Sequence, residues 1–281
     1  LPVSQFYHVS VDNEKPYNVF GGLQDNGSWI GPSKSPGGIS NCDWDNIGYG
    51  DGFNVLRDPA NNNIFYWQYQ GGNVKRMYLD TREFKDIKPF TDDGTKLRFH
   101  WNTPLIFGAK SKALYTGSQF LYKSTDKGDS WQKISPDLTT NDPAKQEQEK
   151  TGGLTLDNSA AENHCTIFTI SESRLDENVI WVGTDDGNVQ VTTDGGKTWN
   201  NTIKNIRGIP PTTWVSYVEA SRYDKSTAYV TFDGHRYGDR KAYVYKTTDF
   251  GKTWISLTDN NIAAYCHVIK EDLKNPKLLF L

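Results

Sequence analysis

One eight-residue pattern occurs three times in this 281-residue chain and limits its possible folds more than any other feature. The copies are STDKGDSW at 124–131, TTDGGKTW at 192–199 and TTDFGKTW at 247–254. All fit Ser/Thr-x-Asp-x-Gly-x-Ser/Thr-Trp. The spacing of their aspartates is about that of a four-stranded propeller blade plus a variable connector, whereas solenoid repeats are usually shorter and more regular.

Each part of the pattern has a physical role in a β-hairpin. The glycine supplies the positive φ of a tight connection, and the aspartate accepts hydrogen bonds from turn N–H groups. The tryptophan starts the next strand and packs between sheets. We therefore predict a structural role for Asp126, Gly128, Trp131, Asp194, Gly196, Trp199, Asp249, Gly251 and Trp254.

Strand signals surround the repeated pattern. Three runs rich in β-branched and aromatic residues, 166–173, 178–187 and 188–196, read as strands A, B and C, and Trp199 opens strand D. The order recurs along the chain, and no amphipathic segment of helix length is present. The sequence predicts an all-β fold, a single partial β-propeller of four-stranded antiparallel blades within a larger propeller. About five and a half blades are expected, at 1–46, 47–90, 97–135, 163–203, 212–258 and 263–281.

The stretch Asp25-Asn26-Gly27 aligns with Asp185-Asp186-Gly187, which connects strands B and C. Asn-Gly is a preferred two-residue hairpin turn, so we expect a turn there. In a propeller, B–C turns and D-to-A connectors share one face, and the repeated turns lie on the other. The Asp25 turn is therefore predicted on the face that ligands approach.

Composition excludes several partners. The 31 basic and 34 acidic side chains give a net charge of -3, and no basic stripe favours nucleic acid. No apolar run reaches the length of a membrane span. Cys42, Cys165 and Cys266 form no CxxC pair, so neither zinc nor a disulfide framework is encoded, and their disulfide state stays open. We expect no cofactor, while structural calcium stays open.

The chain resembles a known group of proteins. The repeats look like Asp-boxes, also called BNR repeats, of sialidases, xyloglucan-cleaving glycosidases and sortilin-type receptors. The stretches 5–29, 117–139 and 180–199 resemble the large bacterial secreted proteins called sortilin (VPS10)-like or BNR-repeat glycosyl hydrolases. This resemblance implies a secreted or cell-surface propeller that belongs to a longer polypeptide. Because the repeat is structural, it implies the fold rather than an activity.

Two functions stay open at this point. The first is a propeller that binds a protein, peptide or glycan on the B–C and D-to-A face without chemistry of its own. The alternative is a glycoside hydrolase with two facing carboxylates, whose separation a sequence cannot give. A sialidase-like site is disfavoured, because residues 1–7 lack its Arg-Ile-Pro signature.

We assign no catalytic residue. His8 aligns with Phe168 in one blade and with Cys266 in another, and it is interpreted as a packing position in a strand. The polar connector 135–165 is interpreted as a surface loop or a lid. The predicted ligand-binding residues are Asp25, Asn26, Trp44, Asp51, Trp101, Asp185, Asp186, Trp214, Asp233 and His235. Of these, Trp44, Trp101 and Trp214 are predicted in or just after D-to-A connectors.

Overall fold

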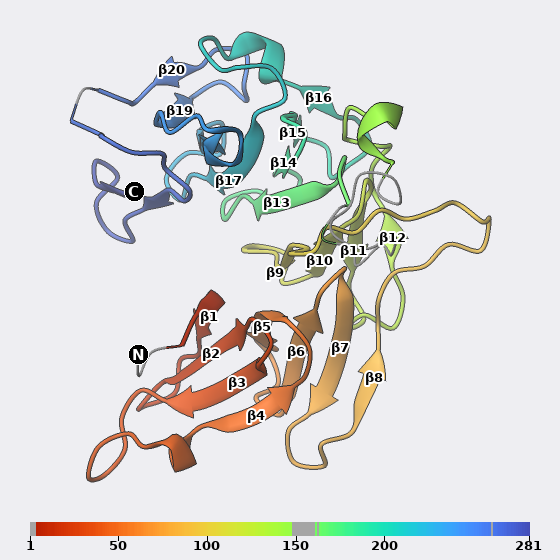
Figure 1. Ribbon diagram of the computed structural model, residues 1–281, viewed down its shortest axis with the longest axis vertical. Coiled ribbons are helices and arrows are strands. Elements are labelled where there is room, and N and C mark those ends of the chain that lie inside the picture. Colours follow the sequence, from red (N-terminus) through yellow and green to blue (C-terminus); the bar gives the residue numbers. More distant parts are fainter. Residues whose placement is uncertain (1–3, 148–160, 162, 260) are drawn as a thin grey trace.

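The computed structural model describes residues 4–147, 161, 163–259 and 261–281, which form an all-β architecture (Figure 1). Five sheets have four strands each and a sixth has two. Within every sheet, strands consecutive in the chain pair antiparallel. The predicted β-propeller of four-stranded blades is confirmed.

The first two sheets contain the N-terminal strands. The first comprises β1 (Phe6–Val11), β2 (Asn18–Leu23), β3 (Gly27–Pro32) and β4 (Asp45–Gly48). The second comprises β5 (Gly52–Arg57), β6 (Ile64–Tyr69), β7 (Asn73–Tyr78) and β8 (Phe84–Asp86). Short 3-10 helices are confined to connections: Asn41–Asp43, Pro143–Lys145, Ile203–Asn205 and His235–Tyr237, the last labelled η4.

The remaining strands continue the same plan. The third sheet comprises β9 (Leu105–Phe107), β10 (Leu114–Gly117), β11 (Leu121–Ser124) and β12 (Gln132–Lys133). The fourth comprises β13 (Ile167–Glu172), β14 (Ile180–Thr184), β15 (Val189–Thr192) and β16 (Asn200–Asn201). The fifth comprises β17 (Trp214–Ala220), β18 (Ala228–Asp233), β19 (Tyr243–Thr247) and β20 (Ile255–Ser256). The two-stranded sheet pairs β21 (Lys270–Glu271) with β22 (Leu279–Phe280).

The sheets follow one another around a common centre, as the order of colours shows (Figure 1). Residues of β1, β5, β9, β13 and β17 line a central cavity, so the first strand of each four-stranded sheet is innermost. The first sheet and the two-stranded sheet face each other across an open side (Figure 1).

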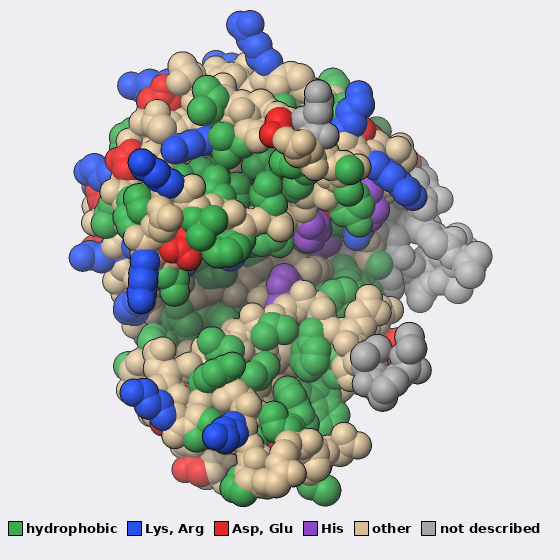
Figure 2. All heavy atoms as spheres, turned by 90° about the vertical axis from the view of Figure 1, so that its left-hand side faces the viewer, with side chains coloured by type: hydrophobic (Ala, Val, Ile, Leu, Met, Phe, Trp, Pro, Cys, Tyr) green, Lys and Arg blue, Asp and Glu red, His purple; other side chains and the backbone are tan. Residues whose placement is uncertain are grey.

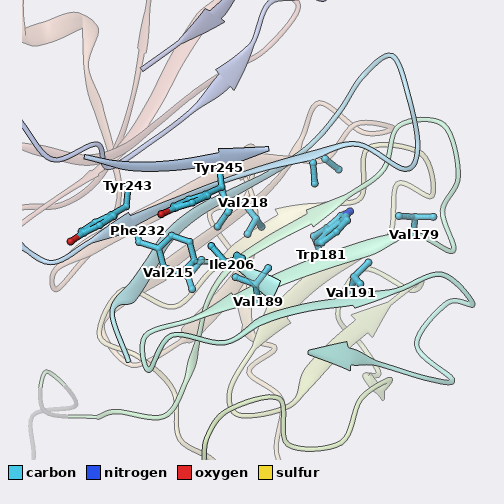
Figure 3. Close-up of a cluster of buried hydrophobic side chains, with 13 residues drawn as sticks. Val179, Trp181, Val189, Val191, Ile206, Val215, Val218, Phe232, Tyr243 and Tyr245 are labelled. Carbon is cyan, nitrogen blue, oxygen red and sulfur yellow. The ribbon is translucent and has the colours of Figure 1, made fainter. Parts of the chain in front are cut away.

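Apolar side chains fill the spaces between neighbouring sheets. The cluster between the fourth and fifth sheets contains Trp181, Val215 and Phe232, each without exposed surface (Figure 3). Burying a tryptophan removes roughly 150–250 Å² from water, worth about 4–6 kcal/mol as an upper bound. These interfaces hold the inner strands in place around the cavity.

The three repeated motifs form the same turn. Asp194 accepts hydrogen bonds from the Thr198 N–H (2.9 Å) and from the hydroxyls of Thr198 (2.6 Å) and Thr192 (2.8 Å). Asp126 and Asp249 accept the equivalent bonds. The motif glycines have φ of +85° to +99° in the first two copies and +81° in the third. The aspartates therefore satisfy their own turns.

Each motif also docks on the preceding blade. The Trp131 Nε1–H donates to the Ile87 carbonyl (2.6 Å), and the Trp199 Nε1–H donates to the Ile134 carbonyl (3.0 Å). A Cβ added to Gly196 would lie 2.4 Å from the same Ile134 oxygen. Glycine is needed there both for its φ and for this close approach.

The Asp25 turn lies between β2 and β3, as predicted, but its form differs. Leu23 pairs with Gly27, so the connection has three residues and Asn26-Gly27 is not its central pair. Asp25, rather than Asn26, takes the left-handed conformation, with φ of 60°. Gly27 is required because a Cβ there would lie 2.1 Å from the Gly48 carbonyl oxygen.

The placement of Trp44 corrects a prediction. It lies between β3 and β4, in a C–D connection, and not in a D-to-A connector. Its ring packs on Gly31 and lies 6.2 Å from the ring of Phe6. The first blade lacks the repeated motif, and Trp44 takes the position before strand D that the motif tryptophans occupy elsewhere.

Candidate ligand-binding cavity

The innermost strands enclose a cavity of about 540 Å³. Its wall combines aromatic rings with amide, imidazole and hydroxyl groups. Figure 2 shows histidine side chains in the hollow between the two halves of the molecule. The polar and aromatic lining residues are Tyr7, His8, Asn54, His100, Trp101, Asn102, Phe168, Thr169, Trp214, Ser216, Tyr217, Asp233, His235, Arg236 and His267.

Asp233 holds two histidines at this wall. One carboxylate oxygen lies 2.6 Å from His235 Nδ1, and the other lies 3.0 Å from His267 Nδ1. Asp233 is 3% exposed, and its hydrogen bonds, against the opposing effect of burial, lower the pKa of its carboxyl. With Nδ1 occupied, each imidazole has its Nε2 left for a ligand.

Arg236 and Trp214 form the adjacent part of the wall. Arg236 lies in η4, and its guanidinium carbon is 4.1 Å from the centre of the Trp214 ring. The Trp214 ring also contacts the rings of Phe168, at 4.7 Å, and His100, at 5.2 Å. This packing fixes the guanidinium at the cavity.

His100 stays neutral in this setting. The Asn102 N–H donates to its Nδ1 at 3.0 Å, so protonation there would break a hydrogen bond. Burial and the nearby positive charge of Arg236 lower its pKa to about 3. The imidazole therefore contributes hydrogen bonding and packing to the cavity, but no charge at neutral pH.

Another part of the wall is made by Tyr7, His8, Trp101 and Asn102. The Tyr7 ring lies 4.4 Å from the ring of Phe53, which in turn meets Trp101 edge-on at 6.4 Å. His8 Nε2 is 2.8 Å from the Asn102 amide oxygen. His8 thus lines the cavity, which corrects its interpretation as a packing position.

The structure separates the predicted ligand-binding residues into groups. Trp101, Trp214, Asp233 and His235 meet at the cavity. Asp51 is 6% exposed and accepts a hydrogen bond from the Asp25 N–H at 2.7 Å, so it supports the neighbouring turn. Asp25 and Asn26 are exposed on that turn and do not line the cavity, and their binding role stays a prediction.

Asp185 and Asp186 are almost wholly buried, at 2% and 1% exposure. Asp185 accepts hydrogen bonds from the Thr166 N–H and hydroxyl, and Asp186 from those of Thr140. Burial raises the pKa of Asp185 to about 8. The pair anchors Thr140, within the 135–165 connector, and Thr166, just beyond it. Residues 148–160 and 162 of the connector lie outside those described, and its interpretation as a surface loop or a lid stays a prediction.

Sequence reasoning missed Arg236, His267, His100, Asn54 and Asn102. Arg236 is the residue after the predicted His235, and it was visible as a cation in a B–C connection. His267 was passed over because alignment compared Cys266 with His8. The predicted propeller brings separate blades together, but no pattern in the sequence shows which of their residues line the cavity.

Asp233 is the single carboxylate among the lining residues that the structure describes. In the same part of the chain, no group of three or more His, Cys, Asp or Glu side chains is arranged to hold a metal ion. No helix within the described ranges is long and apolar enough for a membrane span.

Comparison with known proteins gives structural neighbours only. No protein-family model and no curated protein sequence matches the chain. A GH74 enzyme from Niastella koreensis matches with a TM-score of 0.55 and 16% identity over 88% of this chain and 37% of its own. A GH74 xyloglucanase from Xanthomonas campestris matches with a TM-score of 0.50 and 16% identity, covering 86% of this chain and 36% of that one.

A third neighbour is not named as an enzyme. The extracellular domain of a protein titled as a hybrid two-component system, from B. thetaiotaomicron, matches with a TM-score of 0.56 and 10% identity. The match covers 94% of this chain and 29% of that one. This chain thus spans about a third of the length of these structures, and at such identities the likeness establishes the β-propeller fold alone.

Proposed function

We propose that this chain binds a glycan in its central cavity and does not cleave it. The observation that carries the proposal is that aromatic rings, imidazoles and amides, from separate inner strands and from the connections beside them, surround one space of about 540 Å³. Ligand sites combine apolar walls with a few placed polar groups in this way. One structural neighbour is named a xyloglucanase, which supports a carbohydrate as the ligand class.

The number of carboxylates at the cavity wall favours binding over hydrolysis. Glycosidases use two carboxyl groups about 5–9.5 Å apart. The cavity wall offers Asp233 alone, and both of its oxygens are hydrogen-bonded to histidines. A glycoside hydrolase stays the second candidate, on the strength of the GH74 neighbours, and would need a second carboxylate from outside the described wall.

Location and partners belong to the same proposal. We place the chain in a secreted or cell-surface protein, as part of a longer polypeptide. The resemblance to sortilin-like and BNR-repeat proteins supports this placement, and so does the neighbour named as an extracellular domain. A peptide or protein ligand, which sortilin-type receptors would imply, is the competing outcome of the binding test.

The test is a binding screen against glycan and peptide arrays with Trp101→Ala and Asn102→Ala variants. Trp44→Ala is the matched control, because that ring packs outside the cavity. We expect a glycan whose affinity falls by about tenfold or more for Trp101→Ala and is unchanged for Trp44→Ala, with melting temperatures recorded for all variants. Release of reducing sugar would favour the hydrolase.

The Asn26→Asp variant tests the turn beside the cavity in the same screen. Asn26 is exposed, and its side chain makes one hydrogen bond within the described ranges, from Nδ2 to the Gln24 carbonyl, so a changed affinity at an unchanged melting temperature would report the added charge. If only peptides bind, or if glycans bind equally to every cavity variant, the proposed function is wrong.

A further inference from the structure

Arg236 provides a positive charge that no described protein group neutralises by contact. Its guanidinium lies over Trp214, which leaves the N–H donors at the guanidinium edge without a partner from the ring. Within the described ranges, the guanidinium makes no hydrogen bond and no ion pair. Arg236 is an exposed residue that water still reaches, and the partial burial of its guanidinium at the wall lowers its pKa.

The nearest cavity carboxylate is already engaged. Asp233 attracts Arg236 electrostatically, but its oxygens contact His235 and His267. The other titratable groups of the lining are imidazoles and tyrosines, which add no negative charge at neutral pH. The wall therefore has one negative group that is hydrogen-bonded and one positive group that is not.

We infer that the cavity takes an acidic glycan, one bearing a uronate-type carboxylate, and that Arg236 donates paired hydrogen bonds to this carboxylate. The planar guanidinium matches a carboxylate in a two-bond geometry, and contact with Trp214 already restrains its position. His235 and His267 line the same cavity with Nδ1 engaged by Asp233, so their Nε2 atoms are the ones left for sugar hydroxyls. This inference rests on the proposed glycan-binding function and specifies its ligand.

The experiment measures affinity for oligogalacturonate, for glucuronate-containing oligosaccharides and for the same sugars with their carboxylates reduced to neutral alcohols. The proteins are the wild-type chain, Arg236→Gln, Arg236→Lys and Arg240→Gln. Arg240 is an exposed arginine in the same β18–β19 connection that does not line the cavity, so it controls for net charge.

We expect an acidic probe to bind the wild type and to lose about tenfold or more in affinity with Arg236→Gln. Arg236→Lys should recover part of the loss, and Arg240→Gln should bind as the wild type does. The reduced probes should bind weakly and be indifferent to Arg236→Gln. Added salt should weaken only the binding of acidic probes.

Two results would overturn the inference while leaving glycan binding in place. One is a neutral oligosaccharide that binds as tightly as its acidic form, and the other is an acidic probe that is indifferent to Arg236→Gln. Failure of every glycan, with or without binding of a peptide carboxylate, would overturn the proposed function as well.

Discussion

Each motif aspartate accepts several hydrogen bonds from donors in its own turn. Hydrogen bonds from Ser130 and Ser124 lower the pKa of Asp126 to about 2, and bonds from Thr198 and Thr192 do the same for Asp194. Both carboxylates are thus charged over almost the whole pH range. Their donors are all within the motif, which explains why the same turn forms in three blades.

Acid should therefore weaken the motif turns. The folded pKa of Asp194, about 2, is below the ordinary value, so its stabilisation is complete above about pH 4 and is lost as the pH falls towards 2. We expect the melting temperature of Asp194→Asn to be lower than that of the wild type at ~pH 5. The difference between the two melting temperatures should be smaller at ~pH 2.5. Thermal unfolding followed by circular dichroism measures this.

Asp25→Asn is the control for that measurement. The Asp25 carboxylate is exposed and accepts no hydrogen bond from a described residue, and Asn also tolerates its φ of 60°. Its effect should be small at both pH values. A difference between Asp194→Asn and the wild type that persists unchanged at low pH would refute the charge-based account.

Between blades, the motif tryptophans differ in one respect that can be measured. Trp199 donates to the Ile134 carbonyl, whereas the Trp254 Nε1 is buried and has no partner among the described residues. Trp199→Phe should therefore cost about 1 kcal/mol more in unfolding free energy than Trp254→Phe, because only the first loses a hydrogen bond. Denaturant unfolding of both variants gives the comparison, and equal losses would contradict it.

The sequence was sufficient for elements whose signal is local. Gly196 and Asp194 sit within one turn, so the hairpin and the two strands it joins could be predicted together. Trp44 was misplaced because the first blade has no motif to mark where strand D begins. Arg236 was missed because its value as a site depends on Trp214 and Asp233, which only the folded sheet brings beside it.

Across the whole molecule, the open side between β1 and the two-stranded sheet is apolar. Side chains alternate along β1: Ser10 donates to the Val55 carbonyl of the next sheet, while Val9 and Val11 are 61% and 59% exposed. In and just after β22, Phe280 and Leu281 are 54% and 59% exposed. Figure 2 shows apolar side chains on both walls of this hollow.

Such surfaces favour association of the 281-residue polypeptide in solution. We expect its sedimentation coefficient to rise with concentration, and a double substitution, Val9→Lys with Phe280→Lys, to suppress the rise. The matched control is Tyr237→Lys, which changes a 69% exposed aromatic residue in η4. A wild type that stays monomeric at every concentration tested would contradict the expectation.

The docking of each motif on the blade before it affects how such a molecule can evolve. The acceptors of Trp131 and Trp199 are the main-chain carbonyls of Ile87 and Ile134, and any amino acid supplies a carbonyl. At these two joints the tryptophan hydrogen bond therefore depends on the backbone path of the preceding blade and not on the identity of the side chain at positions 87 and 134. Whole blades could be duplicated or exchanged by recombination with these joints intact, and new cavity residues could then be tried on the inner strands without rebuilding the ring.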